Sequence, residues 1–301
     1  MSEGSGAVQA RDVARVVGAE LGCRVASVAR VIGSVTNTNF AVDTAAGPVV
    51  LKCGAASDMR AEAWACDRVR KVGVAAPEVL ALDTSAAHLD LPYLLTRRLL
   101  GEPSEPDGPA LVEAGRQLAR VHGLPVDGYG FLRENAPDAP VDVGPRRAWA
   151  EVVTGALDGL PDLVAAGVLP AGTADRLRAV VHEHPSLARA GPAVLLHGDL
   201  HPRHVFCADG RLTGIIDWGD VAAGDPLFDL GRFSVAGPVA LDALLRGYTA
   251  DRGLDPGTAA GVTAYRVLWA VLALTYEFRA GGNWFAAYRD VAHAGLAELG
   301  R

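Results

Sequence analysis

The segment HGDLHPRHVFCADGRLTGIID, from His197 to Asp217, decides the fold. Asp199 lies in a loop between two short apolar runs of the kind that form strands, and Asp217 directly follows a third such run. The Asp209-Gly210 pair between the second and third runs predicts a tight hairpin turn. Two carboxylates placed this way suit phosphoryl transfer, in which one orients the attacking hydroxyl and the other holds the magnesium that accompanies the nucleotide phosphates. The segment therefore predicts a phosphotransferase.

The composition favours a soluble enzyme that binds neither nucleic acid nor a membrane. The 301 residues suffice for one large or two modest domains, and a formal net charge of -7 disfavours nucleic acid, which requires a basic surface. The four cysteines form no C-x-x-C pair, a pattern typical of reduced thiols (Cys23, Cys53, Cys66 and Cys207). No signal-peptide pattern opens the sequence, and the longest apolar run, Val267 to Thr275, is too short to span a bilayer. We expect a cytoplasmic monomer or dimer.

Residues 1–99 combine short strand patterns with helical ones. Apolar residues recur at helical spacing from Val8 to Leu21, and a second helix is expected from Met59 to Val72 with Asp58 as its N-cap. Strand patterns cover Val25 to Ile32, Phe40 to Asp43, Val49 to Cys53, Glu78 to Leu82 and Tyr93 to Arg98. This order predicts a small antiparallel sheet with a packed helix.

Helical patterns dominate the second half of the chain. A run rich in proline, glycine and acidic residues, 100–109, predicts a hinge before a larger lobe over 110–301. Helices are expected over Ala110 to His122 with Gly123 as C-cap, Arg146 to Val168, Thr173 to His184, Val239 to Arg252, Thr258 to Arg279 and Trp284 to Leu299. The only strands expected there are Val194 to Leu196, Val205 to Cys207 and Leu212 to Ile216. The chain therefore reads as an α+β fold with two lobes.

Three histidines in the same segment leave a second interpretation open, in which they hold a transition metal in a hydrolase (His197, His201 and His204). Pro202 disrupts the helix that would align these side chains, and a strand begins directly after them, so we favour the aspartate pair. His204, at the end of the loop, is still a candidate metal ligand, although an imidazole nitrogen is softer than magnesium prefers. His197 is expected to brace the loop.

Lys52 lies inside the apolar run Val49 to Cys53, where a lysine is costly unless its ammonium meets an anion. We predict that it holds nucleotide phosphates and pairs with Glu62 on the following helix. Small hydroxyl and amide residues in the preceding turn could cover the phosphates (Ser34, Thr36 and Asn37). Thr96 and Arg98, at the end of the last strand of this lobe, complete the predicted nucleotide site.

In combination these residues resemble the aminoglycoside phosphotransferase superfamily of antibiotic and small-molecule kinases. The catalytic-loop motif of that family is similar to His197-Gly198-Asp199-Leu200-His201-Pro202, its metal motif to Ile216-Asp217-Trp218, and its G-D-P-x-x-D-L motif to residues 224–230. The resemblance covers nearly the whole chain and implies a protein-kinase-like fold. It also implies that Asp199 is the catalytic aspartate, that Asp217 binds Mg2+, and that Asp225 and Asp229 brace the adjoining loop.

His204 stands where most members of that family have asparagine. A histidine there is similar to the macrolide phosphotransferase branch, which often uses GTP. The resemblance therefore leaves ATP and GTP open as donors and favours a macrolide-like or other antibiotic acceptor.

The sparse aromatic residues gather near the C-terminus, on the expected acceptor side. Trp284 and Phe285 follow a flexible Gly281-Gly282-Asn283 break and are candidates for the rim of the acceptor pocket, and Asp220 and Glu277 could meet acceptor hydroxyls or amines. After Asp217, nine acidic residues stand against seven arginines. Because a polycationic acceptor calls for a densely acidic pocket, this balance favours a neutral or weakly charged acceptor.

We therefore predict a Mg2+-dependent phosphotransferase that carries the γ-phosphate of ATP or GTP to a hydroxyl of a small molecule. An antibiotic of the macrolide, nucleoside or aminoglycoside type is the first candidate. One alternative is a metabolic kinase for an amino alcohol, a sugar or a homoserine-like acceptor. Another is a non-catalytic kinase-like protein that only binds nucleotide, in which His204 would reflect lost chemistry.

Overall fold

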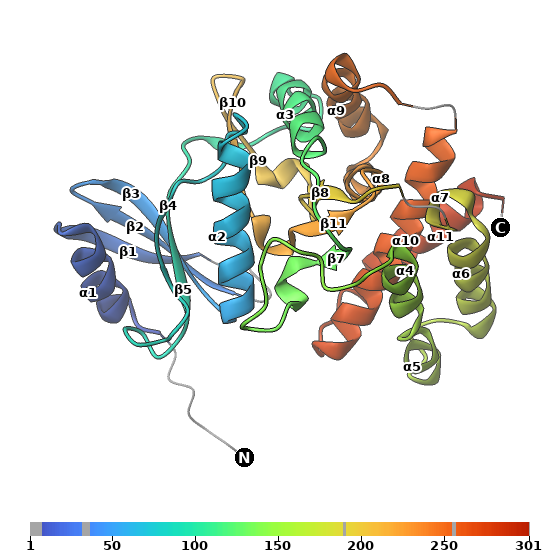
Figure 1. The fold of residues 1–301 in the computed structure, drawn as a ribbon, viewed down its shortest axis with the longest axis horizontal. Coiled ribbons are helices and arrows are strands. Elements are labelled where there is room, and N and C mark those ends of the chain that lie inside the picture. Colours follow the sequence, from blue (N-terminus) through green and yellow to red (C-terminus); the bar gives the residue numbers. More distant parts are fainter. Residues whose placement is uncertain (1–7, 32–36, 189–190, 255–256, 301) are drawn as a thin grey trace.

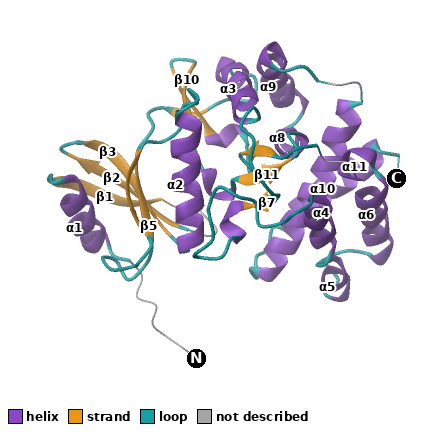
Figure 2. Ribbon diagram, viewed as in Figure 1, coloured by secondary structure: helices purple, strands orange, loops and turns teal. Residues whose placement is uncertain are grey.

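The structure, a computed structural model of the 301-residue chain, describes residues 8–31, 37–188, 191–254 and 257–300. Its N-terminal part is built on a five-stranded antiparallel sheet in the order β1-β2-β3-β5-β4, and its C-terminal part is mainly helical (Figures 1 and 2). The strands are β1 (Val25–Val31), β2 (Thr38–Thr44), β3 (Gly47–Cys53), β4 (Val79–Asp83) and β5 (Tyr93–Arg97). The predicted α+β fold is confirmed.

Helices cover both faces of this sheet (Figure 1). Helix α1 (Ala10–Leu21) buries its valines against Phe40 and Leu51, on one face. Because side chains alternate along a strand, Lys52 points to the other face, where α2 (Ala56–Arg70) lies. Asp58 falls in the first turn of α2 and is not its N-cap, which corrects the sequence prediction. A carboxylate there still interacts favourably with the helix dipole.

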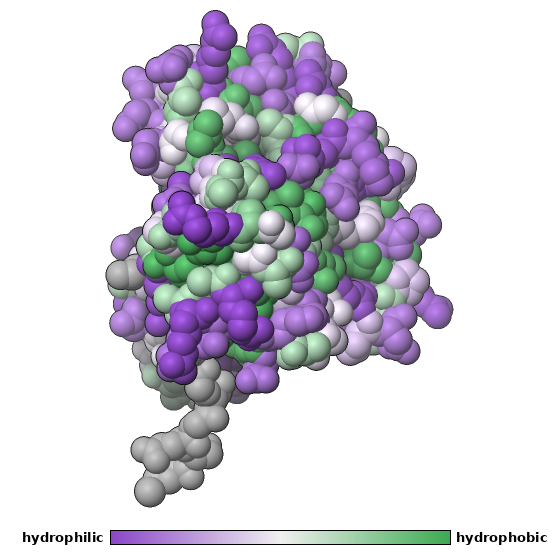
Figure 3. Space-filling view, turned by 90° about the vertical axis from the view of Figure 1, so that its left-hand side faces the viewer, coloured by the Kyte–Doolittle hydropathy of each residue, from purple (hydrophilic) through white to green (hydrophobic). Residues whose placement is uncertain are grey.

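The edge strands of the sheet expose some apolar surface. Seen from this end, the molecule mixes hydrophilic and hydrophobic residues (Figure 3). Val31 on β1 and Leu82 on β4 are 43% and 41% exposed.

The connector 100–109 is tied to the C-terminal part by a short strand. Strand β6 (Glu102–Pro103) pairs with β9 in a three-stranded sheet of order β10-β9-β6, and a second small sheet has the order β7-β11-β8. The strands are β7 (Gly130–Phe131), β8 (Val194–Leu196), β9 (Val205–Ala208), β10 (Arg211–Ile215) and β11 (Ala222–Gly224). Strands β6, β7 and β11 were not predicted, because their sequences (EP, GF and AAG) contain no run of strand-forming apolar residues.

The helices of the C-terminal part largely follow the predicted ranges. They are α3 (Pro109–Val121), α4 (Trp149–Leu157), α5 (Leu160–Ala165), α6 (Ala171–Glu183), α7 (Pro185–Ala188), α8 (Leu227–Phe233), α9 (Pro238–Asp251), α10 (Thr258–Arg279) and α11 (Phe285–Glu298). The single helix expected over 146–168 is wrong, because Gly159 and Pro161 divide it into α4 and α5. Helix α3 ends with His122 at its C-cap, not Gly123.

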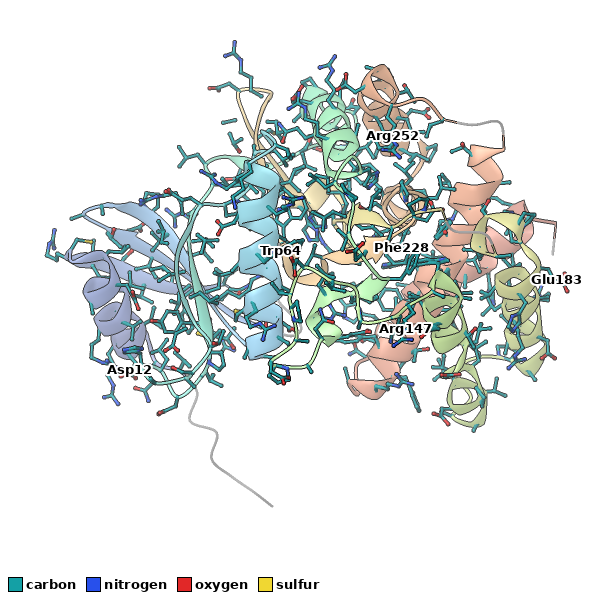
Figure 4. All side chains as sticks on the ribbon, in the orientation of Figure 1. Asp12, Trp64, Arg147, Glu183, Phe228 and Arg252 are labelled. Atoms are coloured by element: carbon teal, nitrogen blue, oxygen red, sulfur yellow. The ribbon has the colours of Figure 1, made fainter. Side chains whose placement is uncertain are left out.

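Two hydrophobic cores support the C-terminal part. The first joins α2 to α3, α8 and α9, and Trp64 of α2 packs against it (Figure 4). The second surrounds α10, where Val267, Leu268 and Val271 are fully buried. Within the described ranges, α10 alone has the length and hydropathy of a membrane-spanning helix, and 56% of its most apolar window is buried inside the protein, as is usual for a core helix.

Candidate active site

The hairpin predicted from the sequence carries the centre of the site. Asp209 and Gly210 both have positive φ, of 50° and 71°, which makes the tight two-residue turn between the antiparallel strands β9 and β10. Beyond β10, the Ile216 amide donates to the carbonyl of His204 over 2.9 Å. This bond brings Asp217, at the end of the hairpin, back to the loop that bears Asp199.

Lys52 bridges the two parts of the chain. Its Nζ lies 2.7 Å from Glu62 Oε2 on α2 and 3.0 Å from Asp217 Oδ1. Burial opposes a charge on this lysine, but the two carboxylates outweigh burial and raise the pKa of Lys52 above its ordinary value. The same contact keeps the pKa of Asp217 well below its usual range, although partial desolvation of this carboxylate opposes its ionisation. The ammonium and the Asp217 carboxylate therefore both stay charged at neutral pH.

The hydrogen bonds of His204 define its tautomer. Nδ1 lies 2.8 Å from the Asp199 carbonyl oxygen and must donate to it, which makes Nε2 the acceptor nitrogen of the ring. Nε2 accepts from Arg203 Nε over 3.1 Å and lies 3.6 Å from Asp217 Oδ2. Burial lowers the pKa of His204 to about 4, so the ring is neutral at pH 7.

The carboxylate of Asp199 is held by a buried arginine. Arg232 Nε of α8 donates to Asp199 Oδ1 over 2.5 Å, and Arg203 lies 3.7 Å from Oδ2. Burial opposes ionisation, but Arg232 outweighs it and lowers the pKa of Asp199. One ligand atom each from Asp199, His204 and Asp217 lies within 4.8 Å of the others. This three-residue group, two carboxylates and one neutral imidazole, is suited to a divalent cation.

A second buried cluster fixes the backbone of the catalytic loop. Both oxygens of Asp229 accept backbone N–H groups, those of His197 and Gly198, at 2.8 Å each. His122 contacts the same carboxylate over 3.0 Å. The His197 ring in turn donates from Nε2 to the carbonyl of Ile216 over 3.0 Å, which links the loop to the strand before Asp217. The sequence led us to expect a bracing role for His197 and Asp229, and that role stays a prediction to which these contacts give a geometry.

Asp225 acts at the start of α8. Its Oδ1 accepts the Leu227 amide over 2.8 Å, and burial raises the pKa of its carboxyl group.

Gly198 has a φ of 85°, and a Cβ there would lie 1.8 Å from the carbonyl oxygen of Asp220. Only glycine therefore fits at this point of the catalytic loop.

The structure places the other predicted nucleotide residues around the β3 strand. Thr96 is buried on β5 and pairs in register with Val50. Arg98 forms an ion pair with Asp43 over 2.8 Å, and it is not part of the cluster around Lys52. Asn37 lies at the edge of the described range, and Ser34 and Thr36 fall outside the described residues.

The predicted acceptor residues have partners within the protein. Asp220 forms an ion pair with Arg133. Glu277 is 4% exposed, and its Oε1 accepts the Trp284 amide over 2.9 Å, closing the turn after α10. Trp284 itself is 59% exposed, and Phe285 packs against Phe278 with ring centroids 6.5 Å apart. Their contact with an acceptor stays a prediction.

Sequence reasoning missed three residues of this cluster: Arg232, Arg203 and His122. Arg232 follows Asp229 by three residues on a helix, a spacing that puts both side chains on one face, but the helix α8 was not predicted.

The three-histidine metal site is not formed, because within the described ranges the potential ligand groups include only His204 among the three. His201 instead accepts the Arg203 amide over 3.2 Å.

Comparison with known proteins shows which family this chain belongs to. The sequence model of the phosphotransferase enzyme family matches residues 28–264, more than half of the chain. Viomycin phosphotransferase from Streptomyces vinaceus is 28% identical over 215 residues, which cover 70% of this chain and 72% of that protein.

Solved structures share the fold over almost the whole chain. A candidate fructosamine-3-kinase from Thermobifida fusca YX-ER1 has a TM-score of 0.71 at 24% identity, covering 95% of this chain and 98% of that one. The aminoglycoside phosphotransferase APH(4)-Ia in complex with ADP and hygromycin B has a TM-score of 0.68 at 17% identity, covering 96% and 97%. Macrolide 2'-phosphotransferase MphH from Brachybacterium faecium has a TM-score of 0.66 at 20% identity, covering 95% and 98%. The motifs, the fold and the family match agree, and the chain belongs to the phosphotransferase enzyme family.

Proposed function

We propose that this phosphotransferase carries the γ-phosphoryl group of ATP or GTP to a hydroxyl of a small antibiotic. The observation that supports this most is the convergence of Lys52, Asp217, His204 and Asp199, from both parts of the chain, on one site. A non-catalytic nucleotide-binding protein would not need Asp199 half-buried, ionised and placed beside a potential metal site.

Each residue has a task in such a transfer. Lys52, held by Glu62, would bind donor phosphate oxygens, since its charge is retained at neutral pH. Asp217 and Nε2 of His204 would hold the metal ion. Asp199 would accept a hydrogen bond from the acceptor hydroxyl and orient its oxygen towards the phosphorus. Bound Mg2+ would neutralise charge on the phosphates, and the loose transition state asks for little more than this positioning.

The three potential ligands suit a divalent cation, and their chemistry bears on which cation they prefer. His204 Nε2 and Asp217 Oδ2 lie 3.6 Å apart, close enough for one cation to bind both atoms. Two carboxylates suit Mg2+, whereas the imidazole shifts the preference towards Mn2+. The guanidinium of Arg203, which now donates to Nε2, would have to move aside. Its side chain is 58% exposed and has room to do so.

The charges near Asp199 support a neutral or weakly charged acceptor. Asp199 is paired with Arg232 and Asp220 with Arg133, so neither offers a free negative charge to a polycation. The relative viomycin phosphotransferase makes antibiotics the first class to test. The metabolic-kinase alternative stays open, because the candidate fructosamine-3-kinase has a higher TM-score and identity, 0.71 and 24%, than the two antibiotic kinases.

A transfer assay would test the proposal. The protein would be incubated with Mg2+ or Mn2+, with ATP or GTP labelled on the γ-phosphate, and with viomycin, hygromycin B, a macrolide or a fructosamine. Phosphorylation of one antibiotic, detected as a mass increase, supports the proposal. Transfer to the fructosamine alone would favour the metabolic kinase, and nucleotide binding without transfer or hydrolysis would favour the binding protein.

A further inference from the structure

Helix α8 reaches the catalytic loop with two side chains from one helical turn. Asp229 and Arg232 are three residues apart and therefore lie on the same face of the helix. Asp229 takes the backbone N–H groups of His197 and Gly198, and Arg232 takes the side chain of Asp199. Three consecutive loop residues are thus fixed by a single turn of α8.

Arg232 is itself held from the other side. Its guanidinium carbon lies 4.2 Å from the centroid of the Trp269 ring on α10, and the residue is 4% exposed. The Trp269 ring is supported edge to face by Tyr288 of α11, with centroids 5.6 Å apart. An arginine that is buried and stacked on an aromatic ring has little freedom to rotate. Its Nε–H therefore points in one fixed direction.

We propose that Arg232 is a positioning residue for phosphoryl transfer, one that determines which oxygen of Asp199 receives the acceptor. Its Nε donates to Oδ1 over 2.5 Å, which occupies one of the two lone pairs of that oxygen and fixes the orientation of the carboxylate. Among the described residues, none donates a hydrogen bond to Oδ2, and Arg203, which is largely exposed, approaches it only to 3.7 Å. The acceptor hydroxyl therefore binds Oδ2, which faces the imidazole ring of His204, whose Nδ1 lies 4.0 Å away.

This role deepens the proposed function and rests on it. A carboxylate that could rotate would offer either oxygen at varying angles, and a displacement of about 1 Å in a reacting group can lower the rate by about 100-fold. The acceptor hydroxyl gains an aligned partner because Arg232 removes this freedom before substrate binds. The residue affects turnover more than nucleotide binding, since Lys52 and Asp217 hold the donor.

Two variants of Arg232 separate positioning from simple stability. Arg232→Met keeps an unbranched side chain against Trp269 but loses the donor and the charge, and Arg232→Lys keeps the charge but not the planar fork. We expect Arg232→Met to lower kcat by about 100-fold with an unchanged KM for nucleotide, and Arg232→Lys to recover part of kcat. Arg266→Gln is the matched control, because Arg266 forms a partly buried ion pair with Glu298 away from the loop, and its kcat should stay at the wild-type value.

These variants test the positioning role of Arg232 even if the acceptor is not an antibiotic. Failure of the wild-type protein to transfer phosphate to any acceptor would count against the proposed function. In that case a crystal structure of Arg232→Met tests the positioning role directly, with a rotated Asp199 carboxylate expected. If Arg232→Met does not fold, Arg232→Lys carries the test through its lower kcat at constant KM. Wild-type kcat in either folded variant, or an Asp199 carboxylate that keeps its orientation without Arg232, would overturn the proposal.

Discussion

Replacing Lys52 by methionine tests whether the link between the two parts of the chain is a buried ion pair. The side chains of Lys52 and Glu62 are 11% and 7% exposed. Removing one partner of such a pair costs about 3–5 kcal/mol, because the other charge stays buried. We expect the lower end, about 3 kcal/mol, because Glu62 can take up a proton and Asp217, whose side chain is 47% exposed, is hydrated.

The expected change is large enough to measure as a melting temperature. At about 2.1 cal/mol/K per residue, unfolding of the 301 residues has an entropy of roughly 0.6 kcal/mol/K, so about 3 kcal/mol lowers Tm by about 5 °C. The double variant Lys52→Met/Glu62→Leu removes both charges and should melt within about 2 °C of the wild type, since apolar replacement of a buried pair is often neutral. Both variants should lack transfer, because neither holds the donor phosphates.

The pH dependence gives an independent check on the same prediction. Burial raises the pKa of Glu62, and in Lys52→Met the cation that opposes this rise is gone. A carboxyl group whose pKa is higher in the folded than in the unfolded state stabilises the fold at low pH. The protein loses this stabilisation as the pH rises through the folded-state pKa. The Tm deficit of Lys52→Met should therefore shrink from pH 8 to pH 5. A deficit below 1 °C at pH 8, or a double variant no more stable than the single one, would refute the buried-pair argument.

Three further changes test the loop and the metal ligands. Asp229→Asn should destabilise the fold by about 3 kcal/mol and lower kcat, because it loses charge-assisted bonds to two loop amides, and denaturant unfolding and transfer assays would show both effects. Gly198→Ala should lose transfer and at least about 1 kcal/mol of stability, because its φ of 85° and the nearby Asp220 carbonyl exclude a Cβ, and calorimetry with the transfer assay would measure this. His204→Asn replaces a nitrogen ligand by an oxygen, so metal titrations of the nucleotide complex should show a shift from Mn2+ towards Mg2+.

The main elements of the fold could be predicted because the sequence patterns that indicate them are local. Alternating strands, the Asp209-Gly210 turn and the period of α10 depend on residues close in the chain, and they reappear at nearly the expected bounds. The same holds for Lys52 and Glu62, since a lysine inside an apolar strand demands a nearby anion. What the sequence missed depends on distant partners: β6 forms only because β9 lies beside it.

The site shows the same limit. Asp199, Asp217 and His204 could be predicted because they share one hairpin segment. Arg232 could not, because its role depends on α8 packing against the catalytic loop and on Trp269 of α10 covering its guanidinium. The acceptor residues were least predictable, because Glu277 serves a turn and Asp220 an ion pair, contacts that no local pattern reveals.

Transfer of the γ-phosphoryl group by the Asp199→Asn variant tests the central claim most directly. Asparagine keeps the size of the side chain but not the charge that accepts the hydroxyl hydrogen bond. A positioned group of this kind contributes about 100- to 10,000-fold to the rate, so kcat should fall within that range while nucleotide affinity, measured by calorimetry, stays at the wild-type value. Wild-type turnover in Asp199→Asn would contradict the assignment of Asp199, Asp217 and Lys52 to one phosphoryl-transfer site.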